Sequence, residues 1–157
     1  MLADLSLFKK DPNFRNFKTD DWDVLSSYLE QKTFEAKSHV FKENDPGDGF
    51  YWVQKGKIKI ARHFIPEGKK KIQENILTVL SPGAIFGEMA LIDRPARSAD
   101  AIAESDAALL HLSHSQYEKL CKEHPGTAML IQDLLVLTLC SRIREANRNF
   151  ETILFLV

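Results

Sequence analysis

Hydrophobic and polar positions follow three successive patterns along this chain of 157 residues. Over residues 1–32 the apolar side chains recur every three or four positions, as they do on one face of a helix. Over residues 33–112 they alternate with polar side chains in short runs, and over 113–157 the helical spacing returns. The patterns predict a single, mainly β domain: an antiparallel jelly-roll β-barrel with N-terminal helices and a long C-terminal helix.

Turn residues divide the central region into short strands. Asn44–Gly49, Lys55-Gly56 and Pro66–Gly68 carry the Asn, Asp, Pro and Gly residues that turns favour. Lys69–Lys71, which follows the last of these turns, is expected to be a solvated loop. The expected strands are Phe34–Lys37, Val40–Lys42, Phe50–Gln54, Lys57–Arg62, Ile72–Leu80 and the run from Ser98 to Leu112.

The C-terminal region predicts two helices. Ser113 or Ser115 can cap the first, which ends before Pro125-Gly126, and the second is expected from about Thr127 to at least Phe150. The barrel can cover only the first half of the apolar seam on the long helix, so the second half predicts a two-fold dimer. The seam consists of Leu135, Leu139, Ile143, Ala146, Phe150 and Ile153.

Composition narrows the class of protein. The chain is 44% hydrophobic and 27% charged, as is usual for a soluble globular domain, and its net charge of −1 does not favour bulk binding of nucleic acid or anionic lipid. Cys121 and Cys140 are expected to be free thiols. Met1–Leu5 lacks the basic start of a signal peptide, and no apolar run was expected to approach a membrane span. We therefore expect a cytoplasmic protein without a membrane partner.

The stretch Leu80–Ala99 combines the groups that hold a small anion. Gly87 allows the backbone to approach a ligand closely, and the first N–H groups of the short helix expected after it lack intrahelical partners. Glu88 offers two acceptor oxygens to hydroxyl or N–H donors. Arg97 offers a planar fork of donors that fits two phosphate oxygens.

The motif in this stretch is Phe86-Gly87-Glu88-Met89-Ala90-Leu91-Ile92, followed by Pro95-Ala96-Arg97-Ser98-Ala99. It resembles the phosphate-binding cassette of the cyclic nucleotide-binding domains, and the wider resemblance covers about residues 20–145. That family includes the catabolite activator protein, the regulatory subunits of cyclic AMP-dependent protein kinase and the cyclic nucleotide-gated channels. The cassette itself spans residues 86–99.

The resemblance implies a role for each cassette residue. It gives Glu88 the ribose 2′-hydroxyl and Arg97 the cyclic phosphate, with further contacts from Ser98 and from backbone N–H groups. Arg142 of the long helix would lie against the purine, with Thr138 and Leu139 one turn earlier; alternatively Arg142 is an exposed helix charge. Ile60, Leu77 and Leu80 would line the nucleotide or are simply core residues. The complete implied set is Ile60, Leu77, Leu80, Phe86, Gly87, Glu88, Met89, Ala90, Arg97, Ser98, Ala99 and Arg142.

The function implied by this resemblance is that of a sensor rather than an enzyme. It would bind cyclic AMP in preference to cyclic GMP, need no metal or other cofactor, and signal to an effector protein through its long C-terminal helix. Ser98 would also permit cyclic GMP, because a hydroxyl there can reach the guanine amino group.

Three other functions stay open. The chain, which ends at Val157, could be the ligand-binding part of a transcription regulator that lacks its helix-turn-helix, and it is then not expected to contact nucleic acid directly. It could be a scaffold that dimerises without a ligand. It could also be a small-molecule enzyme on a jelly roll, although no histidine pair has the spacing of metal ligands.

Overall fold

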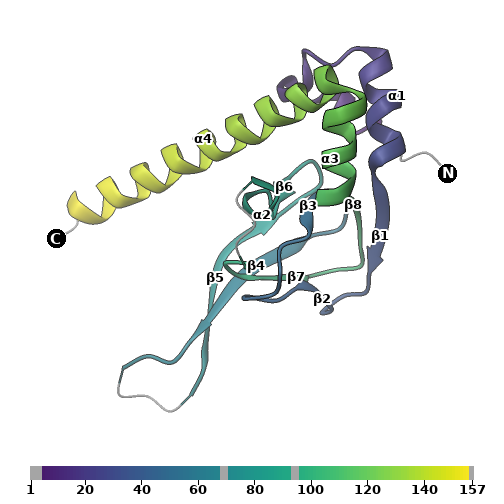
Figure 1. Cartoon of the computed structure of the whole chain (residues 1–157). Helices are drawn as coiled ribbons and strands as arrows, with labels where there is room; N and C mark the ends of the chain where they lie inside the picture. The colour runs from purple at the N-terminus through teal and green to yellow at the C-terminus, as the bar shows by residue number, and fades with distance from the viewer. Residues whose placement is uncertain (1–4, 68–70, 93–95, 156–157) are drawn as a thin grey trace.

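The structure, a computed structural model, describes residues 5–67, 71–92 and 96–155 (Figure 1). Pro95 of the cassette and Lys69 and Lys70 of the expected loop lie outside this range. The elements are η1 (Phe8–Lys10), η2 (Pro12–Phe14), α1 (Thr19–Tyr28), β1 (Glu30–Phe34), β2 (His39–Phe41), β3 (Gly49–Lys55), β4 (Ile58–Phe64), β5 (Gln73–Leu80), β6 (Ile85–Phe86), α2 (Met89–Ile92), β7 (Asp100–Ala103), β8 (Ala107–Ser113), α3 (His114–Glu123) and α4 (Pro125–Phe155).

The strands form two four-stranded antiparallel sheets. Their orders are β1-β8-β3-β6 and β2-β7-β4-β5, so strands distant in sequence lie side by side in each sheet. Helices α1, α3 and α4 lie together at one end of the first sheet (Figure 1). This arrangement confirms the predicted jelly roll with flanking helices.

Strands β3 and β8 are buried on both faces, which explains why they are the most continuously apolar runs in the chain. Phe50 and Trp52 belong to the hydrophobic cluster that packs under the helices, whereas Tyr51 and Val53 belong to the cluster inside the barrel. Because neighbouring residues of a strand point to opposite faces, β3 joins the two clusters.

Two element boundaries differ from the expected ones. Strand β1 begins at Glu30, directly after α1, so the barrel starts three residues earlier than the expected 33. Helix α4 begins at Pro125 rather than Thr127, because proline is well suited to the first turn of a helix. The Ser113 hydroxyl accepts the backbone N–H of Gln116 and caps α3, as predicted.

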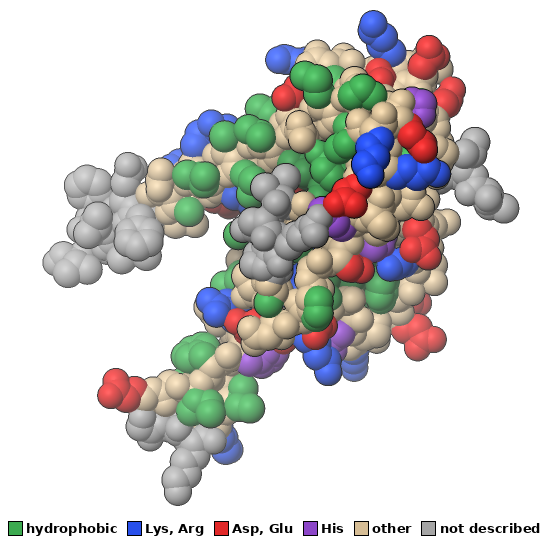
Figure 2. Space-filling view, in the orientation of Figure 1, with side chains coloured by type: hydrophobic (Ala, Val, Ile, Leu, Met, Phe, Trp, Pro, Cys, Tyr) green, Lys and Arg blue, Asp and Glu red, His purple; other side chains and the backbone are tan. Residues whose placement is uncertain are grey.

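Two elements project from the barrel: the C-terminal half of α4 and the β4–β5 hairpin (Figure 1). Hydrophobic side chains lie along both projections (Figure 2). Ile143 on α4 is 60% exposed, as expected for the second half of the seam, while Leu135 is buried against the domain. The side chains of Phe150 and Ile153 lie outside the described ones.

Helix α4 also corrects the expectation that no segment approaches a membrane span. Its Pro125–Asn149 part is long and apolar enough to cross a membrane by length and composition, with a mean hydropathy of 1.4 over its best window. The core helices of soluble proteins meet the same criterion. In this chain one face of the first half of α4 packs in the core, and 28% of the window is buried.

Candidate functional site

A cavity of about 490 Å³ lies between the cassette, strands β4 and β5, and helix α4. This volume is in the range of small-molecule sites. The twelve residues implied by the cassette resemblance all line it, although they come from four separate parts of the chain. The lining consists of Phe41, Ile60, Leu77, Thr78, Leu80, Phe86, Gly87, Glu88, Met89, Ala90, Ala96, Arg97, Ser98, Ala99 and Arg142.

An irregularity in β5 shapes the apolar wall of this cavity. Ile60 pairs with Thr78 and Ala61 pairs with Ile76, so Leu77 has no partner and forms a β-bulge. In a regular strand, residue 77 would point away from 78 and 80. Because a bulge re-aims side chains, Leu77, Thr78 and Leu80 all line the same cavity.

Arg97 is 4% exposed, and three protein acceptors hold its guanidinium. Its Nη1 donates to the carbonyls of Gly49 (2.9 Å) and Gly87 (3.0 Å), and its Nη2 donates to Asp48 Oδ1 at 2.6 Å. The guanidinium carbon also lies 4.1 Å from the ring centre of Phe41. The buried Nε has no hydrogen-bond partner among the described residues.

Gly87 is required at its position for two reasons. Its φ of +73° is in the left-handed region, where a side chain is strained. A Cβ there would also lie 2.6 Å from Arg97 Nη1. The glycine therefore makes room for the arginine that follows ten residues later in the chain.

Glu88 is 1% exposed and pairs with an arginine from a distant helix. Its Oε1 accepts a short hydrogen bond from Arg142 Nη1, and Arg142 Nη2 donates to the carbonyl of Ile85 at 2.5 Å. Glu88 Oε2 is buried and has no partner in the part of the chain that the structure describes. The contact fixes α4 to the cassette and shows that Arg142 is not simply an exposed helix charge.

The turn before β3 supplies a site residue that the sequence pattern did not single out. Asp48 pairs with Arg97, and the imidazole of His111 beside it, with help from Arg97, holds the pKa of Asp48 at about 2. In the sequence Asp48 is one of several turn residues, and only the fold brings it to Arg97.

Three further lining residues are outside the implied set: Phe41 and Thr78, whose strands carry no motif, and Ala96, which lies within the cassette. Thr138 and Leu139 do not line the cavity. Thr138 instead borders a neighbouring hollow, and its hydroxyl donates to the carbonyl of Leu134 at 2.9 Å.

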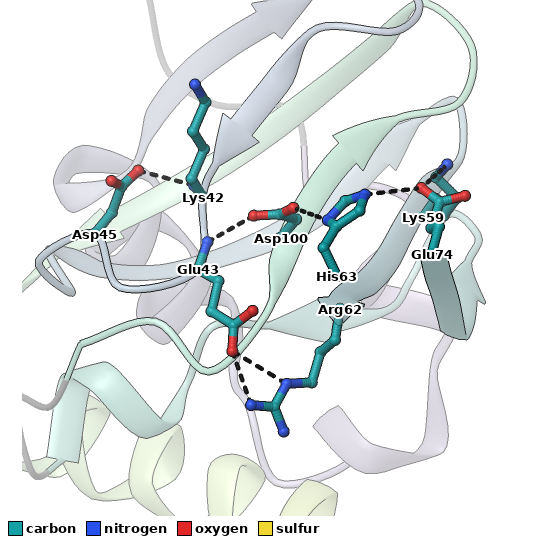
Figure 3. A network of polar contacts seen from close by, with 8 residues as sticks. All are labelled: Lys42, Glu43, Asp45, Lys59, Arg62, His63, Glu74 and Asp100. Carbon is teal, nitrogen blue, oxygen red and sulfur yellow. Dashed lines mark hydrogen bonds and ion pairs between the residues drawn. The ribbon is translucent and has the colours of Figure 1, made fainter. Parts of the chain in front are cut away.

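A polar network joins the second sheet to the 42–45 turn (Figure 3). Asp100 accepts the backbone N–H of Glu43 at 2.7 Å and lies 2.8 Å from Nδ1 of His63. The network fixes the 42–45 turn, and this turn makes backbone hydrogen bonds of 2.8 and 2.9 Å to Arg97. The position of Arg97 thus depends in part on Asp100, which is not among the residues that line the cavity.

The comparison with known families identifies this architecture. The model of the cyclic nucleotide-binding domain matches residues 31–124. The chain belongs to this family. The matched segment contains the cassette and all of the barrel except Glu30, the first residue of β1, and it ends before α4.

Similar proteins are regulators of the same family. The cyclic AMP receptor protein of Thermus thermophilus is 31% identical over 94% of this chain and 64% of its own length. The CRP-like cAMP-activated global transcriptional regulator of Mycobacterium tuberculosis is 28% identical over 84% of this chain and 55% of its own length. The chain therefore spans less than two thirds of these curated relatives.

Solved structures match the fold closely. The catabolite activator protein of Thermus thermophilus has a TM-score of 0.76 at 32% identity, covering 92% of this chain and 64% of its own. A cyclic nucleotide-binding domain from Methylobacillus flagellatus KT has a TM-score of 0.80 at 26% identity, covering 92% and 79%.

Proposed function

We propose that this protein binds a cyclic nucleotide, with cyclic AMP preferred, and acts as a sensor rather than an enzyme. The observation that carries the proposal is a pair of buried charged groups in one cavity. Glu88 and Arg97 each retain a buried polar atom, Oε2 and Nε, without a hydrogen-bond partner among the described residues. Such atoms are costly unless a ligand satisfies them.

The two groups differ in chemistry in the way that a nucleotide requires. A carboxylate oxygen accepts from a ribose hydroxyl, and a guanidinium edge donates to a phosphate oxygen. Ser98 and Ala99 border the same end of the cavity. Ile60, Leu77 and Leu80 offer the purine an apolar wall.

One observation supports the preference for cyclic AMP. Both curated relatives carry cyclic AMP in their names. Ser98 is compatible with either base, so the cassette alone does not decide. Calorimetric titration with cyclic AMP and cyclic GMP side by side tests the proposal. We expect cyclic AMP to bind more tightly; a clear preference for cyclic GMP would reverse the choice of base, and no binding of either would refute the function.

We further propose that α4 carries the signal. Arg142 connects the helix to Glu88, the same residue that would hold the ribose. A ligand that hydrogen-bonds to Glu88 shares this carboxylate with Arg142 and therefore changes the stability of the contact. The equilibrium between two positions of α4 can shift by no more than the difference in the ligand's affinity for them.

A further inference from the structure

A buried histidine lies next to the phosphate end of the cavity, and the proposed function does not use it. His111 is in β8, between β1 and β3 in the first sheet, and is 3% exposed. Its ring stacks on Tyr51 with 4.4 Å between ring centres. Neither ring nitrogen makes a hydrogen bond of ordinary length to the described residues.

Carboxylates lie on both sides of this imidazole. Nε2 is 3.5 Å from Asp48 Oδ2, and Nδ1 is 3.9 Å from Glu30 Oε2. A neutral imidazole can donate to only one of them, whereas a protonated one donates to both. Gly49 permits the close approach, because a Cβ there would lie 3.0 Å from Nε2.

Asp48 connects this histidine to the anion site. Its Oδ2 faces His111 and its Oδ1 lies 2.6 Å from Arg97 Nη2. We propose that His111 positions Asp48 against Arg97, so that protonation of His111 frees Arg97 for the cyclic phosphate and tightens nucleotide binding as the pH falls.

The direction follows from charge. Protonated His111 donates to Asp48 and compensates its charge, so Asp48 competes less with a phosphate for Arg97. It also adds one positive charge near the anion. Binding and protonation are reciprocal, so nucleotide binding should cause the protein to take up a proton from solution at His111. Histidine is the side chain whose ordinary titration lies between about pH 5 and 8.

The other ionisable groups around His111 are placed so that they do not reverse this direction. Glu30 from β1 adds a second negative charge on the other side of the ring. Burial raises the pKa of Tyr51 from β3 to about 12, so its hydroxyl stays neutral. Lys32 lies 5.9 Å from the Tyr51 ring. Tyr28 and Glu30 border a hollow of about 240 Å³ that reaches His111 and gives protons a route to it.

The test is calorimetry of cyclic AMP binding at about pH 5.5 and about pH 8. The inference rests on the proposed function, binding of a cyclic nucleotide. Cyclic AMP keeps one charge state over this pH range. We expect Kd to be about threefold to tenfold lower at the acid pH. The heat should also vary with the ionisation enthalpy of the buffer, which measures proton uptake.

Three variants separate the histidine from other titrating groups. His111→Gln should bind with nearly the same Kd at both pH values. His39→Gln, at an exposed position in β2, should keep the wild-type dependence. Asp48→Asn alters a half-exposed side chain rather than a buried one, and it should abolish the dependence even if His111→Gln does not fold.

Two results would overturn the inference: equal Kd at both pH values in the wild type, or an unchanged pH dependence in Asp48→Asn. Absence of binding at either pH would refute the proposed function as well, so the two failures are distinguishable.

Discussion

At the scale of single residues, the site consists of two buried charges that already have protein partners. Arg97 is held by Asp48 and two backbone carbonyls, and Glu88 is held by Arg142. Buried charges persist only when they are paired in this way. A ligand therefore gains only the difference between its own contacts and those it replaces or shares.

Arg97→Ala should weaken cyclic AMP binding by about ten- to a hundredfold, because hydrogen bonds to a charged group contribute about 1.5–3 kcal/mol and 1.4 kcal/mol is tenfold. Calorimetry gives the change in Kd. Arg15→Ala is the matched control, because Arg15 is exposed and belongs neither to the cavity lining nor to the polar network of Figure 3. If Arg97→Ala bound as tightly as the wild type, the assignment of the phosphate site would be wrong.

Glu88→Ala should weaken binding of cyclic AMP more than binding of its 2′-deoxy analogue, since only the former has the hydroxyl that Glu88 accepts. The quantity to measure is the ratio of the two Kd values in wild type and variant. The ratio should move toward one in Glu88→Ala and stay unchanged in Glu104→Ala, which alters an exposed carboxylate between β7 and β8. An unchanged ratio in Glu88→Ala would show that Glu88 does not contact the ribose 2′-hydroxyl.

The sequence predicted these two anchors because they lie nine residues apart in one cassette, where local spacing carries the information. Asp48 and His111 could not be found in this way. They are 49 and 14 residues from Arg97 in the sequence, and only the β3–β8 pairing brings them together.

At the scale of elements, α4 and β5 also show that local spacing in the sequence does not predict contacts that depend on the fold. Helical spacing predicted α4 and the burial of Leu135, but the contact of Arg142 with Glu88 depends on the direction in which the helix leaves the domain. Thr138 and Leu139 were expected at the cavity and lie elsewhere. The bulge at Leu77 has no Gly or Pro to mark it, so the alternation of β5 gave no sign that Leu77 and Thr78 face one cavity.

Cyclic AMP should slow amide hydrogen exchange in residues 127–150 if α4 responds to the ligand. Arg142→Ala should reduce both the affinity and this protection while leaving exchange in the barrel unchanged, because it removes the contact with Glu88. Arg144→Ala alters a neighbouring, exposed arginine on the same helix and serves as the control. Equal exchange of α4 with and without nucleotide would show that the signal leaves the barrel by another route.

At the scale of the whole molecule, most of the exposed large hydrophobic side chains lie on helix α4 and on the β4–β5 hairpin (Figure 2). On α4 the exposed set is Met129, Val136, Leu137 and Ile143; on and beside the β4–β5 hairpin it is Phe64, Ile65, Ile72, Ile76, Leu77 and Val79. Contiguous apolar surface of this kind is typical of contact sites.

The last prediction is that α4 joins two copies in a symmetric dimer. The domain buries Leu135, but Ile143 stays exposed, and leaving apolar area in water costs about 25 cal/mol per Å². A second α4 presents the same seam, so a two-fold axis along the helix would bury both halves at once. Sedimentation at micromolar protein should show a dimer, and Ile143→Glu should dissociate it because each copy would place a charge in the seam. Ser141→Glu adds the same charge on the opposite, exposed face of the helix and should leave the dimer intact. If the wild-type protein stays monomeric at these concentrations, self-association through α4 is excluded, and the exposed seam would have to bind a different partner.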